Sequence, residues 1–109
     1  MYKRQVDGAA GRVPSDATAW PGRDMKWAQV IVGVDPDPAN AELVKAWTID
    51  YWDAVHPYAT GGAYVNFMMD EGQGRVEATY GENFSRLAAI KAKYDPDNLF
   101  HVNQNIRPA

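Results

Sequence analysis

The chain has 109 residues, of which 46% are hydrophobic, including four Trp, six Tyr and three Phe, and its formal net charge is −3. This length fits one domain with a hydrophobic core, while the absence of cysteine excludes disulfides, thiolate metal sites and cysteine nucleophiles. The dispersed charges predict no nucleic-acid partner, and the lack of a long apolar run or a signal-peptide pattern predicts a cytoplasmic domain outside the membrane.

The first part of the chain is predicted to hold an arm and a strand. Residues 1–24 are expected to form an extended arm, because Gly and Pro interrupt them repeatedly, with Trp20 as its anchor on the body. Residues 25–34 are rich in β-branched side chains and end at an Asp-Pro pair, which predicts a strand.

A long helix should follow. Asp37 is a candidate N-cap and Pro38 fits the first helical position. Apolar residues at three- and four-residue spacing continue the helix to about Val55, where His56-Pro57 ends it.

The second half repeats this order of strand and helix. Residues 63–69 alternate as a second strand, residues 74–80 favour a short helical turn, and Asn83 is a candidate N-cap for a helix over 84–94. In that helix a core stripe is expected from Phe84, Leu87, Ala88, Ile90 and Tyr94.

These elements predict an α+β domain: a small antiparallel sheet with two main helices packed on one face, an extended N-terminal arm and a docking C-terminal tail. The expected division of the single domain 1–109 is an arm (1–24), a body (25–94) and a tail (95–109). Because a stable sheet needs about three strands, either the arm or a partner should supply more.

Few residues are candidates for chemistry. His56 and His101 have no partners at metal or triad spacing, so we expect both to be structural, and no metal site is predicted. Tyr64 and Asn66 could share one face of a small-molecule or flavin pocket, or lie on a half-exposed sheet face. The amides of residues 103–105 need either solvent or a polar ligand, and their spacing leaves both open.

Two stretches of the sequence carry a recognisable pattern. The string GGAYVNFMMDEG, followed by RVEATYGENFSRLAAIKAKYDPDNLFHVNQNIRP, is similar to the C-terminal end of the berberine bridge enzyme-like family of FAD-linked oxidoreductases. Members typically close with a Y-x-N-[YF] strand, a Y-D-P-x-N-x-F turn and an N-Q-x-I tail. The stretch GRVPSDATAWPGRD resembles the segment that opens this terminal region, so the resemblance covers nearly the whole chain.

The resemblance implies an enzyme that oxidises its substrate by hydride transfer to FAD. The implied partner of this chain is an FAD-binding domain or subunit, on which the tail docks. Tyr64 and Asn66 inherit a place beside the flavin ring or the substrate, with Tyr64 as a candidate catalytic group. The amides of Asn103, Gln104 and Asn105 inherit a role at the flavin side.

The sequence also departs from the family pattern. It contains no glycine-rich FAD segment and no cysteine for flavin attachment, and Phe67 stands where many members have a tyrosine proposed as catalytic base. Because the cofactor carries the hydride chemistry, we expect the chain alone to be inactive. One alternative interpretation is a free-standing homodimeric α+β module that binds a small ligand or a protein, and a second is a degenerate remnant with no activity.

Overall fold

The computed structural model describes residues 2–109, with side chains from residue 4 onward. Its sheet consists of β1 (Tyr2–Gln5) and β2 (Trp27–Val30), which pair antiparallel with Gln5 opposite Trp27. The sequence left open whether the arm or a partner supplies further strands. The arm supplies one strand, β1. The strand predicted over 25–34 is shorter than expected, because ladder pairing ends at Val30.

The first long helix is confirmed at both ends. The Asp37 carboxylate accepts a hydrogen bond from the Ala39 amide at 2.9 Å, and Pro38 opens a 3-10 turn, η2 (Pro38–Asn40). This turn leads directly into α1 (Ala41–Val55). A second 3-10 turn, η3 (His56–Tyr58), ends the helix at the predicted His-Pro step.

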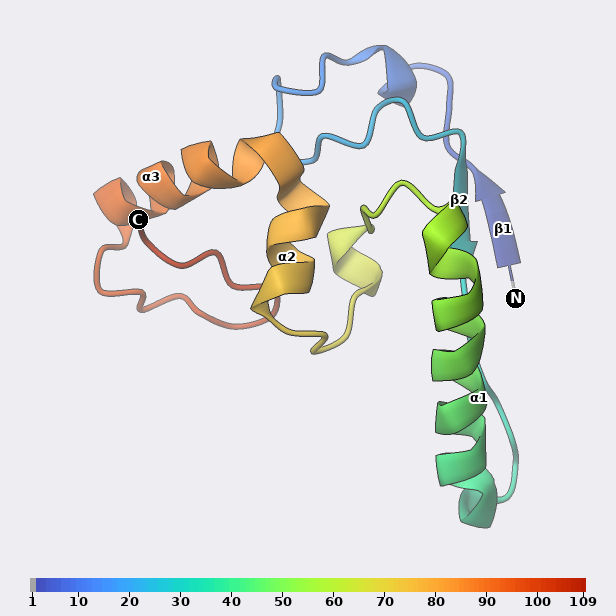
Figure 1. Cartoon of the computed structure of the whole chain (residues 1–109). Coiled ribbons are helices and arrows are strands. Elements are labelled where there is room, and N and C mark those ends of the chain that lie inside the picture. The colour runs from blue at the N-terminus through green and yellow to red at the C-terminus, as the bar shows by residue number, and fades with distance from the viewer. Residues whose placement is uncertain (1) are drawn as a thin grey trace.

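Helix α1 lies along β2, on the same side of the molecule as the sheet (Figure 1). Gly33, just beyond β2, permits this close approach. A Cβ atom at Gly33 would lie 2.3 Å from Cγ1 of Val44 and 3.3 Å from its carbonyl oxygen. The Gln29 amide also reaches the Tyr51 hydroxyl at 3.4 Å.

The hydrophobic core lies in the second half of the chain, around α2 (Gln73–Tyr80), η5 (Gly81–Asn83) and α3 (Phe84–Tyr94). These elements confirm the two helices predicted there. Among the described side chains, those that are buried all come from this half: Met68, Val76, Thr79, Asn83 and Ala88. The expected core stripe of α3 is wrong in part, because Ile90 and Tyr94 are 45% and 74% exposed.

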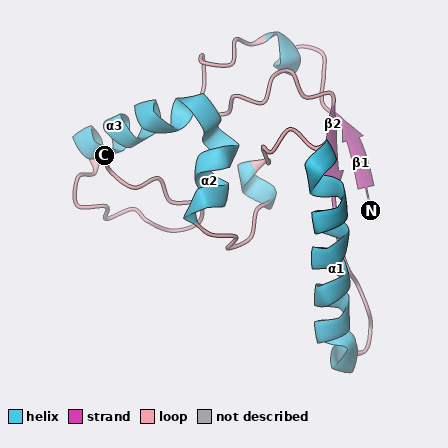
Figure 2. Cartoon of the chain, in the orientation of Figure 1, coloured by secondary structure: helices cyan, strands magenta, loops and turns pink. Residues whose placement is uncertain are grey.

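The strand predicted over residues 63–69 does not form. The Phe67 amide donates to the Tyr64 carbonyl at 2.9 Å, which closes the 3-10 turn η4 (Val65–Phe67). Residue alternation alone cannot make a strand without a neighbouring ladder, and the described sheet, β1 with β2, lies elsewhere (Figure 2).

The arm crosses over the corner between α2 and α3 and is held there by side chains (Figure 1). The buried Asn83 amide donates to the carbonyls of Ser15 at 2.7 Å and Thr18 at 3.2 Å, and Arg86 donates to Thr18 at 3.0 Å. Asn83 thus precedes α3 as predicted, but its side chain holds the arm and does not cap the helix. Trp20 anchors the arm as expected, by donating to the Ala63 carbonyl at 3.2 Å.

Arg75 joins the half that contains α1 to the half that contains α2 and α3. Its guanidinium donates to the Gly61 carbonyl at 2.6 Å and pairs with the Glu71 carboxylate at 3.3 Å. The same group lies 5.5 Å from the ring centre of Trp52 on α1. One side chain therefore bridges three segments.

The α+β class is confirmed, with a small antiparallel sheet and two main helices, of which α1 lies beside the sheet and α3 across the molecule (Figure 2). The division into arm, body and tail stays a prediction. In the described part of the chain, no helix has the length and apolar character needed to cross a bilayer.

Candidate functional site

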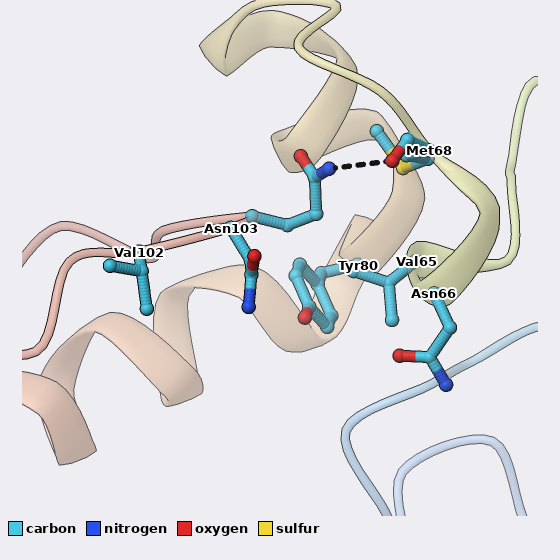
Figure 3. A pocket seen from close by; sticks show the side chains of 7 residues that line it. Val65, Asn66, Met68, Tyr80, Val102 and Asn103 are labelled. Carbon is cyan, nitrogen blue, oxygen red and sulfur yellow. Dashed lines mark hydrogen bonds between the residues drawn. The ribbon is translucent and has the colours of Figure 1, made fainter.

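A cavity of about 400 Å³ lies between η4, the end of α2 and the tail (Figure 3). This volume falls in the range of small-molecule sites, about 300–1,000 Å³. Segments nearly 40 residues apart in the sequence meet here. The lining residues are Val65, Asn66, Met68, Tyr80, Val102, Asn103 and Gln104.

Gln104 fixes the tail against the opposite wall of the cavity. Its amide nitrogen donates to the carbonyls of Met68 and Met69, each at 3.0 Å. Met68 is itself buried, and its sulfur accepts a hydrogen bond from the Thr79 hydroxyl at 3.2 Å. The two walls are thus held together by hydrogen bonds and by a packed side chain.

Asn66 and Tyr64 contact each other, but only Asn66 lines the cavity. The Asn66 amide nitrogen donates to the Tyr64 hydroxyl at 2.8 Å. The Tyr64 ring stands edge-on to Trp20 and Phe67, with centroid distances of 6.2 and 5.2 Å. Tyr64 therefore lies on the arm side of η4, beside the cavity.

The three tail amides have different surroundings. Asn103 adopts a left-handed backbone, with φ of +59°, and none of the described groups forms a hydrogen bond with its side-chain amide. Asn105 lies outside the cavity, where its carbonyl accepts from the Gln73 amide at 3.4 Å. Of the five residues predicted for the site, the cavity brings together three, namely Asn66, Asn103 and Gln104.

Tyr80 is the one polar residue of the cavity lining that sequence reasoning missed. It ends α2, directly before Gly81, whose φ of +49° turns the chain sharply toward η5. The Tyr-Gly pair at a helix end was the signal that could have drawn attention to it. Burial raises the pKa of the Tyr80 phenol, so the hydroxyl stays protonated at neutral pH.

The cavity is electrostatically neutral, because its lining holds no Asp, Glu, Lys, Arg or His.

Within the described residues, no group of three His, Cys, Asp or Glu could hold a metal ion. His56 stacks on Trp52 at a centroid distance of 4.3 Å. His101 contacts the carbonyl of Asn98 at 3.1 Å, in a loop and away from the cavity lining.

The stretch of sequence that forms the cavity is similar to a known family. Residues 63–107, which include every lining residue, match the family described as berberine and berberine like. The FAD-linked oxidoreductase YgaK of Bacillus subtilis is 34% identical over 108 residues, covering 99% of this chain and 24% of YgaK. The FAD-linked oxidoreductase fogF of Aspergillus ruber is 41% identical, covering 87% of this chain and 20% of fogF.

A plant relative is also similar to nearly all of this chain but much longer than it. Berberine bridge enzyme-like 17 of Arabidopsis thaliana is 30% identical, over 100% of this chain and 24% of the relative. The chain therefore spans about a fifth to a quarter of the length of these relatives. Residues 63–107 are thus similar to the berberine and berberine-like family, and the chain as a whole is similar to part of proteins named FAD-linked oxidoreductases.

Proposed function

We propose that this chain is the C-terminal, flavin-proximal part of an FAD-dependent oxidoreductase. It packs against an FAD-binding domain or subunit and is inactive without it. The names of the relatives, FAD-linked oxidoreductases, support the flavin connection. In the assembled enzyme, Tyr64 and Asn66 lie beside the flavin ring or the substrate, and residues 103–105 face the flavin side.

The observation that carries the proposal is the amount of surface that the chain leaves open. Its radius of gyration is 16.2 Å, whereas a compact chain of this length has about 13 Å. Its accessible surface is 8245 Å², against about 6,000 Å² for a compact protein of this mass. The excess, about 2,200 Å², is more than twice the roughly 800 Å² that each partner contributes to a stable interface.

Exposed apolar side chains occur on two parts of the chain, on α1 and from the end of α3 into the tail, and these elements lie on different parts of the molecule (Figure 1). The α1 surface consists of Leu43 and Trp47, which share one face of the helix and are 70% and 49% exposed. The tail surface consists of Tyr94, Leu99, Phe100 and Val102, which are 72–77% exposed.

Their separation argues for a large partner. A two-fold homodimer buries one self-complementary patch on each subunit, which would leave the other surface in water. A polypeptide large enough to contact both surfaces covers the whole excess. This favours an FAD-binding domain over a second copy of the chain.

The tail surface stands on a rigid support. The Asp95 carboxylate accepts hydrogen bonds from the Leu99 and Phe100 amides at 2.8 and 3.0 Å. It also pairs with Lys91, which in turn donates to the Phe100 carbonyl. Apolar side chains held in this way lose little conformational entropy on binding, which is the property of an interaction hot spot.

The cavity fits one part of the cofactor. Its carboxamides, phenol and apolar walls suit an uncharged ring with hydrogen-bonding edges, and the absence of basic residues from its lining makes it a poor site for phosphates. A bound flavin supplies the redox chemistry. Asn66 and Asn103 would orient the ring, whereas Phe67 lies outside the lining and has no titratable group.

Reconstitution tests the proposal. The chain would be co-expressed with YgaK from which the aligned 24% has been deleted, and the complex followed by light scattering and flavin absorbance. We expect a one-to-one complex that carries flavin. Phe100→Ser should weaken the complex about 30-fold, as expected for a buried aromatic hot spot of about 2 kcal/mol.

The matched control is Tyr58→Ser, since Tyr58 is 91% exposed and belongs to neither apolar surface. This variant should assemble as the wild type does. A chain that remains alone, or one that forms a stable homodimer with both surfaces resistant to mutation, would contradict the proposal, and the dimer would favour the free-standing module.

A further inference from the structure

Tyr80 lies between Asn103 and Asn66 in the cavity and contributes a hydroxyl group with no assigned role (Figure 3). Its ring is half-buried at the end of α2. Among the described backbone groups and the side chains from residue 4 onward, none forms a hydrogen bond with this hydroxyl. A phenol oxygen without a protein partner, on the wall of a cavity, is available to a ligand.

A second available polar group stands on the same wall. The Asn103 amide also lacks a partner in the described chain, and the two residues that follow it fix its place. The next residue, Gln104, is bonded to two carbonyls across the cavity, and the Asn103 carbonyl accepts from the Asn105 amide at 3.0 Å. The backbone therefore holds the Asn103 side chain in position without using its amide.

The charge state of the lining side chains restricts which ligands the cavity can bind. Burial raises the pKa of Tyr80, and the other lining side chains do not titrate, so the whole wall is uncharged at neutral pH. A charged group would lose hydration here without gaining an ionic partner. Val65, Met68 and Val102 add apolar contact, which suits a ring or another flat molecule.

We propose that the Tyr80 hydroxyl is a ligand-contacting group, which together with Asn103 binds an uncharged molecule, or the uncharged part of one, through a hydrogen bond. This assignment rests on the proposed function for the cavity as a flavin-side site. It adds Tyr80 to that site and limits the site to the ring portion of a ligand.

Binding of riboflavin and of FMN to the 109-residue chain tests the assignment, because the two probes share one ring and differ by a phosphate. Flavin fluorescence would follow both titrations. We expect saturable riboflavin binding, and FMN should bind no more tightly, since the phosphate finds no basic partner in the cavity. Tighter binding of FMN would overturn the uncharged assignment.

Variants separate Tyr80 from the rest of the cavity. Tyr80→Phe keeps the ring and should weaken riboflavin binding about 5- to 10-fold, the usual effect of one lost hydrogen bond. It should unfold at the same urea concentration as the wild type, because the hydroxyl has no partner in the described protein. Asn103→Gly retains the left-handed backbone and should weaken binding by a similar factor.

The matched control is Tyr94→Phe, which deletes the same hydroxyl from a tyrosine that is 74% exposed and outside the cavity. Equal riboflavin affinities for the Tyr80→Phe and Tyr94→Phe variants, or no saturable binding by the wild type, would refute the inference. If the chain nevertheless assembles with the flavin-binding partner, the proposed function stands while this inference fails.

Discussion

Replacement of Asn83 by alanine should release the arm from the helical corner. The Asn83 side chain is 6% exposed, and its single amide nitrogen serves three arm carbonyls, those of Ser15, Thr18 and Ala19, at 2.7, 3.2 and 3.4 Å. Alanine removes the donor and leaves a small void. The hydrogen bonds cross more than 60 residues of sequence, so nothing local replaces them.

The expected loss follows from the surroundings of each carbonyl. Thr18 keeps a donor, because Arg86 also binds its carbonyl at 3.0 Å. Ser15 and Ala19 lie on the exposed part of the arm, where water can take over their hydrogen bonds. The cost is therefore that of about one to two net hydrogen bonds, about 1–2 kcal/mol, and not the penalty for buried unpaired groups.

The loss should appear first as local opening. A cost of 1–2 kcal/mol raises the open population of the arm about 5- to 30-fold. Trypsin cleavage after Arg12, an exposed residue of the arm, reports this population when reclosing is fast. The control is Glu82→Ala, next to Asn83 on η5, whose exposed side chain forms no ion pair or hydrogen bond within residues 2–109.

Cleavage after Arg12 should accelerate in Asn83→Ala and stay within about twofold of the wild type in Glu82→Ala. Equal rates for the two variants would refute the reasoning, since the arm would then be held by contacts other than the Asn83 amide. A large drop in the urea midpoint without faster cleavage would also refute it, because Asn83 would then support the helical core and not the arm.

Acidification should loosen the tail turn, because a hydrogen bond from Lys91 and backbone amides lowers the pKa of Asp95. This stabilisation is fully present above the pKa of an aspartate in the unfolded chain, about 3.9, and is lost as the pH falls through the lower pKa of Asp95 in the folded chain. Amide hydrogen exchange of the tail turn should detect the loss, and Asp95→Asn should remove the pH dependence. Gly33→Ala should lower the free energy of unfolding, measured by urea denaturation, by about 1–3 kcal/mol, because the new methyl group overlaps α1. The control Gly74→Ala places its methyl group in open space and should be neutral or stabilising. Arg75→Gln should separate the two halves and raise the radius of gyration above 16.2 Å, and an unchanged scattering profile would count against the bridging role.

The features that sequence alone predicted are those determined by neighbouring residues. Asp37 and Pro38 specify the start of a helix within three residues, and the His56-Pro57 step specifies its end. The helices over 73–80 and 84–94 follow in the same way from local spacing. The family resemblance implied a flavin-side role for Asn66 and, separately, for the tail amides, and this role stays a prediction. The cavity places Asn66 beside Asn103 and Gln104.

What the sequence could not predict depends on distant contacts. The alternation in residues 63–69 is compatible with a strand, but the hydrogen bonds of Tyr64 and Val65 close a 3-10 turn because no ladder is available beside them. Asn83 looks like a cap until the arm is seen to cross it. Tyr80 enters the cavity only because the tail returns to α2, across more than 20 residues.

The burial of Asn83 has a consequence for how the protein is produced. Asn83, Phe84 and Ser85 spell an N-x-S acceptor for oligosaccharides. In the folded chain the acceptor nitrogen is enclosed and already bonded to the arm. A sugar could be attached only before folding, and the arm would then have no place to dock. Secretion from a eukaryotic host should therefore yield a protease-sensitive product, whereas expression in the bacterial cytoplasm should yield a protein whose arm is docked and resists protease.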